Sequence, residues 1–237
     1  MRVRRHVICA LFLCPALYAG DAVPDPRTPA AKPGAEWQQK HAANVAAAQA
    51  GGIEVVFLGD SITEYWNAEG KDVWAKNIAP LKAANFGIAA DKVENVLWRV
   101  QNGEFKGIHP KVVVLLCGIN NTWALKRETR ESGGTAIADG LGEVIKSIRA
   151  ESPQTKILLL GILPMKDGVD LSVKTANAAL AKLDDGKGVK YFDLGSKLAD
   201  KDGNLAAENT KDGLHLSAKG YEIWAKEVLP VLATMMK

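Results

Sequence analysis

A serine stands at a sharp turn directly after an apolar stretch. The segment Gly59-Asp60-Ser61-Ile62-Thr63 follows the run Val55–Leu58. A small residue lets the chain turn where a strand ends, which would place Ser61 at the carboxyl edge of a sheet, where open α/β sheets bind ligands. Free N–H groups at the start of a helix there suit a developing oxyanion. Ser61 is therefore a candidate nucleophile or, alternatively, only a helix cap. For Asp60 we favour a structural role, bonding N–H groups of the turn.

A serine hydroxyl is a weak nucleophile and needs a base. The histidines beyond the N-terminal region are His41, His109 and His215. His215 follows Asp212 by three residues, just before a predicted final helix. Asp212 can accept from one ring nitrogen, which leaves the other free to take a proton. A surface loop or a metal-binding pair are the alternatives. No second cluster of His, Asp or Glu at ligand spacing accompanies this pair, so we predict no metal site.

Two further predicted strand ends carry candidate oxyanion donors. Asn120 lies in Gly118-Ile119-Asn120-Asn121, after the apolar run Val112–Cys117, and has a carboxamide N–H₂ that can donate. Gly87 ends a weaker strand candidate, where the absence of a side chain lets a backbone N–H approach a ligand closely. Taken singly, Asn120 and Gly87 look like turn residues. Taken with the serine and histidine motifs, they predict one site at one edge of a sheet.

Continuous apolar runs predict the strands that position these residues. None of the three strongest runs alternates polar with apolar residues, which is typical of strands buried on both faces of a parallel sheet. The predicted strands, including two weaker ones, are Val55–Leu58, Ala83–Phe86, Val112–Cys117, Ile157–Leu160 and Val189–Phe192.

Helical spacing fills the gaps between the predicted strands. A breaker-free stretch predicts a helix over Trp37–Ala50, and apolar stripes predict three more, within 93–100, 137–148 and 221–232. Asp91 with Glu94 resembles a capping box before the first stripe. Strands alternating with helices imply right-handed βαβ units, and so a three-layer α/β domain.

The N-terminal region has the three-part form of a secretory signal peptide. A basic stretch is followed by the uncharged run Val7–Ala19 and by small residues. The run is too short for a membrane-spanning helix. We predict a signal peptide over 1–19, a Pro-rich linker over 20–35 and a catalytic domain over 36–237. The protein would then be secreted or periplasmic. A buried N-terminal helix is the alternative for 1–19.

Charge and composition exclude several classes of protein. Apolar residues make up 47% and charged residues 24% of the 237 residues, which is ordinary for a globular domain. Residues 1–19 carry three of the 30 Lys and Arg residues and none of the 27 acidic ones, so 27 basic and 27 acidic residues remain. A neutral body argues against nucleic-acid binding and polybasic membrane binding.

The four motifs, in this order, resemble those of the SGNH hydrolases, also called GDSL esterases and lipases. The nucleophile motif is matched by Gly59-Asp60-Ser61-Ile62, the oxyanion glycine by Gly87, the Gly-x-Asn block by 118–120 and the Asp-x-x-His block by 212–215. Asn121 stands where the family motif commonly has Asp. In this departure the sequence resembles the catalytic subunits of platelet-activating-factor acetylhydrolase.

The resemblance implies a flavodoxin-like three-layer α/β/α sandwich with a mainly parallel five-stranded sheet. It also implies a cofactor-free ester hydrolase in which Ser61 attacks, His215 is the base and Asp212 orients it. Ser61 and Gly87 N–H groups and the Asn120 side chain would form the oxyanion hole.

The substrate follows less directly from the residues. No long lid or large insertion is visible, which favours a short acyl group, with acetyl as the simplest case, on a carbohydrate or lipid-derived alcohol. Tyr65, Trp66 and Trp123 are near the motifs and could stack on a sugar or pack in the core, and Lys166 is a candidate for anionic substrates. The alternatives to an esterase are a carbohydrate-binding module on the same fold, a lysophospholipase and an acyltransferase.

Overall fold

A parallel five-stranded sheet forms the centre of the molecule. The computed structural model describes residues 23–237, and the predicted signal peptide lies outside that range. The strand order is β2-β1-β3-β4-β5, and every neighbouring pair is parallel. This is the order of flavodoxin-like folds, in which ligands bind where the order reverses, between the first and third strands. The strands are β1 Val55–Gly59, β2 Ala83–Gly87, β3 Val112–Leu116, β4 Lys156–Leu160 and β5 Val189–Phe192.

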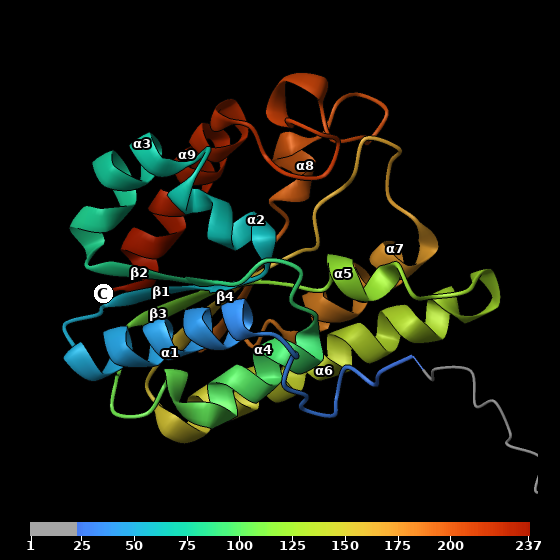
Figure 1. Cartoon of the computed structure of the whole chain (residues 1–237). Coiled ribbons are helices and arrows are strands. Elements are labelled where there is room, and N and C mark those ends of the chain that lie inside the picture. The colour runs from blue at the N-terminus through green and yellow to red at the C-terminus, as the bar shows by residue number, and fades with distance from the viewer. Residues whose placement is uncertain (1–22) are drawn as a thin grey trace, which may run out of the picture.

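Helices cover both faces of this sheet and complete the three predicted layers. Figure 1 shows α1, α4 and α6 on one face and α3 and α9 on the other. The helices are α1 Ala35–Ala50, α2 Ser61–Glu64, α3 Lys71–Val73, α4 Val93–Arg99, α5 Ile119–Thr122, α6 Arg130–Glu151, α7 Leu171–Leu180, α8 Gly195–Leu198 and α9 Ala218–Met235. Short 3₁₀ and π turns extend several of them. No helix within residues 23–237 is long and apolar enough to cross a membrane.

The apolar runs form the core, as their lack of alternation predicts. All residues of β1 and β3 are buried. The stripe of α6 packs beneath them through Ile137, Leu141 and Val144. All five predicted strands are confirmed, with ends shifted by at most one residue.

The predicted capping box before α4 is wrong. Lys92 is the residue that precedes the helix, and its N–H donates to Asn95 Oδ1 at 2.9 Å. Asp91 instead turns into the interior, and Glu94 accepts from the Asn121 side chain at 2.7 Å. The Arg99 guanidinium donates to the Asp91 carboxylate, and the Asn121 amide donates to the Glu94 carboxylate. Neither carboxylate is therefore free to cap the helix.

Residues 23–34, the described part of the predicted linker, lie along the domain. The Ala30 N–H donates to Glu94 O at 3.0 Å, and the Ala30 carbonyl accepts from Asn95 Nδ2 at 2.9 Å. The Pro26 main chain packs so closely on α6 that only glycine fits at position 140. This segment has no regular secondary structure, yet hydrogen bonds fix it to α4.

Candidate active site

Ser61 begins α2 at the carboxyl end of β1. Asp60 caps the helix, its Oδ1 accepting from the Ile62 N–H at 3.0 Å. A side chain at Gly59 would overlap the Leu116 carbonyl oxygen and Thr63 Oγ1, so only glycine lets β1 turn so closely past β3. The turn thus places the Ser61 hydroxyl at the switch point of the sheet.

The structure brings Ser61, His215 and Asp212 into one hydrogen-bonded chain. Ser61 Oγ lies 3.0 Å from His215 Nε2, and His215 Nδ1 lies 2.6 Å from Asp212 Oδ2. When Nδ1 donates to the carboxylate, Nε2 is the acceptor for the serine proton. Ser61 and Asp212 are 151 positions apart in sequence, and the folding of the chain around the parallel sheet brings them together.

The Asp212 carboxylate is held ionised. Partial burial acts to raise its pKa, but hydrogen bonds from the His215 ring and from the N–H groups of His215 and Leu214 outweigh burial and lower the pKa to about 2. The two backbone donors reach Asp212 Oδ1 at 2.8 and 3.0 Å. Asp212 therefore carries a full negative charge next to the imidazole at any pH above about 4.

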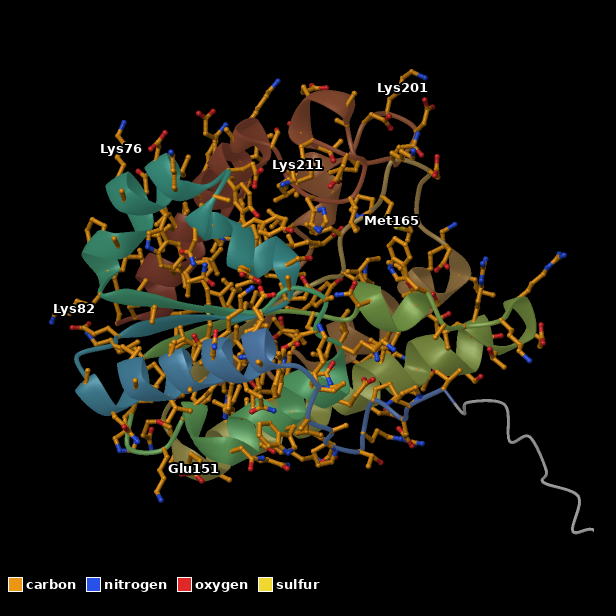
Figure 2. The ribbon with its side chains drawn as sticks, viewed as in Figure 1. Lys76, Lys82, Glu151, Met165, Lys201 and Lys211 are labelled. Atoms are coloured by element: carbon orange, nitrogen blue, oxygen red, sulfur yellow. The ribbon has the colours of Figure 1, made fainter. Side chains whose placement is uncertain are left out.

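Side chains from α2 and its extension brace the histidine loop. The Tyr65 ring packs against His215 with ring centroids 4.9 Å apart, and the Lys211 ammonium lies 4.3 Å from the Tyr65 ring centroid. Lys211 also pairs with Glu69 at 2.6 Å. Figure 2 shows Lys211 on the side of the sheet that carries α2. These contacts tie the loop to the helix that bears the serine.

A small pocket of about 260 Å³ opens onto the serine and histidine. Alanines and a leucine form the apolar part of its wall. Its lining residues are Ser61, Tyr65, Ala89, Ala90, Asn120, Trp123, Leu214 and His215.

Asn120 lines this pocket, as the sequence predicts, whereas Gly87 does not. The Asn120 Nδ2 donates one hydrogen to the Asp91 carbonyl at 2.9 Å, which leaves its second hydrogen available to a ligand. The Gly87 N–H donates to Asn85 Oδ1 at 2.9 Å, and a side chain at Gly87 would overlap the Glu64 main chain. Gly87 is thus required for close packing of β2 on α2, and the geometry does not support it as an oxyanion donor.

Ala90 is the pocket residue that sequence reasoning missed. It has a φ of 58°, a left-handed conformation uncommon for a residue with a side chain. Within residues 23–237 its N–H has no hydrogen-bond acceptor, and the same holds for the Ser61 N–H. Both lie in the pocket with the Asn120 side chain. An alanine in a left-handed turn carries no composition signal, so only the backbone geometry reveals it.

The three predicted substrate-binding side chains have different positions. Trp123 is 65% exposed and lines the pocket. Trp66 is wrong as a substrate contact, because it is fully buried with Tyr221 and Trp224 around it. Lys166 is exposed beside the histidine loop, its N–H donating to Gly213 O at 2.8 Å, but it is not among the residues that line the pocket.

Asn121, where the chain departs from the common motif, is a structural residue. It is buried, its Oδ1 accepts from the Val93 N–H at 3.0 Å, and its Nδ2 donates to Glu94 Oε2. An amide serves both purposes at once, since it accepts from one group and donates to the other. Asn121 therefore fixes α5 to the start of α4.

Asp60 carries a buried acid next to the nucleophile. Desolvation raises its pKa to about 7, and the nearby Asp91 charge acts in the same direction. Within the described residues its Oδ2 has no hydrogen-bond partner. Since the folded chain holds this proton more tightly than the unfolded chain, Asp60 lowers stability progressively as the pH rises from about 4 to about 7.

The Asp60→Asn variant should lose this pH dependence. Relative to the variant, the wild-type free energy of unfolding should fall between pH 4 and 7, by up to roughly 4 kcal/mol at about 1.4 kcal/mol per pKa unit. Urea unfolding across that range measures the difference. Asp139→Asn, on the exposed face of α6, is the matched control and should run parallel to wild type. Parallel curves for Asp60→Asn would show that the buried carboxyl does not titrate in this window.

A serine, a histidine and a carboxylate joined by hydrogen bonds in this order on an α/β sandwich are the arrangement that serine-type hydrolases use. A family model supports the same conclusion: the model of the GDSL-like lipase/acylhydrolase family matches residues 57–223. The chain therefore belongs to this family, which the four motifs predict.

Curated relatives and solved structures agree with this assignment. The chain is 33% identical over 175 residues to platelet-activating factor acetylhydrolase IB subunit alpha2 of Homo sapiens, with 71% of each chain covered. It is 30% identical over 194 residues to the alpha1 subunit of Homo sapiens, with 78% of each covered. A GDSL-like lipase structure from Bacteroides thetaiotaomicron shares the fold, with a TM-score of 0.60, 19% identity and coverage of 83% of this chain and 97% of that one.

Proposed function

We propose that the protein is a secreted serine esterase that hydrolyses short-chain, chiefly acetyl, esters. The observation that carries the proposal is the contact of 3.0 Å between Ser61 Oγ and His215 Nε2, with Asp212 behind the ring. A binding module would need no such base, whereas a nucleophilic serine does.

The mechanism follows from the positions of these groups. Ser61 Oγ attacks the ester carbonyl while His215 Nε2 takes its proton, and His215 then returns that proton to the leaving alcohol. The resulting acyl-enzyme is attacked by water, which His215 deprotonates in turn. Throughout, the Asp212 carboxylate stabilises the imidazolium.

Three donors face the position where the carbonyl oxygen becomes an oxyanion. They are the N–H groups of Ser61 and Ala90 and the second Nδ2 hydrogen of Asn120. Ala90 thus takes the place that the sequence motif assigns to Gly87. Donors fixed in advance toward a developing charge are worth several kcal/mol of activation free energy, typically about 3–4 for one removed.

The substrate class rests on the pocket and the relatives. The pocket of about 260 Å³ has to hold part of the alcohol as well as the acyl group, which favours a short acyl chain. The curated relatives bear the name acetylhydrolase. The exposed Trp123 at the mouth gives a flat apolar surface for the alcohol portion, a sugar ring or a lipid-derived group.

Secretion is supported by the basic residues at positions 2, 4 and 5 and the uncharged run after them. N-terminal sequencing of the native protein should begin near Gly20 or Val23. Recovery of an intact Met1 end would contradict export with cleavage.

A series of p-nitrophenyl esters tests the acyl specificity. We expect kcat/KM for the acetate to exceed that for the octanoate at least tenfold, because each methylene that finds no room costs about 1–3 kcal/mol. A preference for octanoate would contradict the short-acyl proposal.

On acetylated xylan and on an acetylated ether phospholipid, Trp123→Ala should raise KM only for the substrate whose alcohol stacks on Trp123, and Trp123→Phe should restore the wild-type KM.

A further inference from the structure

Three charged side chains lie fully buried beneath the active site. Arg99 Nε lies 2.8 Å from Asp91 Oδ2, and an Arg99 terminal nitrogen lies 2.6 Å from Glu104 Oε2, with all three side chains at 0% exposure. Buried ion pairs seldom add stability over apolar packing of the same volume, because desolvation offsets their attraction. A network of this kind therefore points to a purpose other than stability.

Arg99 connects the ends of the two strands that lead into the site. Its terminal nitrogens donate to the Gly59 carbonyl and to the Phe86 carbonyl, each at 3.1 Å. Gly59 ends β1 two residues before Ser61, and Phe86 is four residues before Ala90. One rigid guanidinium thus sets the nucleophile turn and the oxyanion turn relative to each other.

Asp91 connects this network to the oxyanion donors. Its carboxylate is held from two sides, by Arg99 Nε and by Trp37 Nε1 at 2.7 Å. Its own carbonyl oxygen accepts from Asn120 Nδ2 at 2.9 Å. It also follows Ala90, whose left-handed backbone must be held by its surroundings. The same residue thus fixes the amide of Asn120 and the peptide that carries the Ala90 N–H.

We propose that Asp91, clamped by Arg99 and by Trp37 of α1, is the positioning residue of the oxyanion hole. The proposal rests on the esterase function proposed above. With one Asn120 hydrogen bonded to the Asp91 carbonyl, the direction of the other is determined by planar amide geometry. A shift of Asp91 turns this donor away from the oxyanion, and a misplacement of about 1 Å can cost about 10²-fold in rate.

Trp37→Phe is the variant that tests the clamp. Alanine at Asp91 or Arg99 would leave a buried charge unpaired and could unfold the chain. Trp37→Phe keeps an aromatic ring in α1 and removes the N–H to Asp91 together with part of the indole ring, a loss of size that Trp98→Phe reproduces. We expect kcat on p-nitrophenyl acetate to fall about tenfold with KM unchanged, because the oxyanion exists only in the transition state.

Trp98→Phe is the matched control. Its ring lies 5.4 Å from that of Trp37 in the same aromatic cluster, but within residues 23–237 its indole N–H makes no hydrogen bond to Asp91. It should keep wild-type kcat.

The clamp should also act through Asn120. Asn120→Ala should therefore lower kcat about 10²–10³-fold, and adding Trp37→Phe to it should lower kcat by clearly less than tenfold more, because only the Ala90 donor is left for the clamp to position.

The outcomes separate this inference from the function on which it rests. Full turnover by Ser61→Ala would contradict the esterase mechanism itself. Reduced kcat in Ser61→Ala and Asn120→Ala, together with wild-type kcat in Trp37→Phe, would overturn the clamp alone. The clamp would also be overturned by equal losses in Trp37→Phe and Trp98→Phe, or by a full tenfold loss from Trp37→Phe in the Asn120→Ala background.

Discussion

Replacement of Ser61 by alanine is expected to lower kcat about 10⁶-fold, the scale seen when a serine hydrolase loses its nucleophile. The Ser61 hydroxyl lies 3.0 Å from His215 Nε2, and among the described residues that line the pocket no other hydroxyl is hydrogen-bonded to a histidine. The KM should change little, since the pocket walls remain. The measurement is kcat on p-nitrophenyl acetate, and intact-mass spectra should show one fluorophosphonate adduct on wild type and none on Ser61→Ala.

Ser61 and His215 should act as a unit. His215→Ala should cost about as much as Ser61→Ala, and the double variant should lose no more than either, because each alone already disables the proton transfer. His109→Ala is the control, since His109 is exposed at the opposite edge of the sheet and contacts Ser152. Additive losses, or wild-type turnover by His215→Ala, would contradict the pairing.

The strands could be predicted from their apolar runs, and the reacting residues from four motifs that occur together in one order. Runs such as 55–58 and 112–117 are apolar without alternation, and only strands covered on both faces are stable with that pattern. Parallel strands place their carboxyl ends at one edge, so Ser61 and Asn120 had to lie close together. Asp212 and His215 alone are also typical of a surface loop or a metal pair, and they became a specific signal only beside the serine, Gly87 and Asn120 motifs.

The remaining parts of the site depend on contacts that no local pattern encodes. Gly87 and Ala90 are three residues apart, and only the hydrogen bond from Gly87 to Asn85 shows that its N–H is already used. Trp66 is close in sequence to Ser61 but faces Trp224, 158 positions later. The sequence around Asp91 is typical of a helix cap, and only the structure shows that its carboxylate binds the buried Arg99 instead. Proximity in sequence indicates the neighbourhood of a side chain and not its direction.

Asp212→Asn is expected to lower kcat about 10⁴-fold while the site keeps its shape. Asp212 Oδ1 accepts from the N–H groups of Leu214 and His215, so an asparagine oxygen would stay there. Its NH₂ would then face His215 Nδ1 and force that nitrogen to accept. The ring proton moves to Nε2, which can no longer take the serine proton. The variant should therefore lose kcat with KM nearly unchanged, as measured on p-nitrophenyl acetate.

The pH dependence sharpens this test. Because its hydrogen bonds hold the Asp212 pKa at about 2, the carboxylate stays ionised above pH 4, and its protonation cannot cause any loss of wild-type activity there. The difference between wild type and Asp212→Asn should therefore persist at every pH above 4. Asp200→Asn is the matched control, because Asp200 accepts backbone N–H groups in a similar turn with no histidine bonded to it. If Asp212→Asn and Asp200→Asn had equal kcat, Asp212 would be only a turn residue, and the base would need another partner.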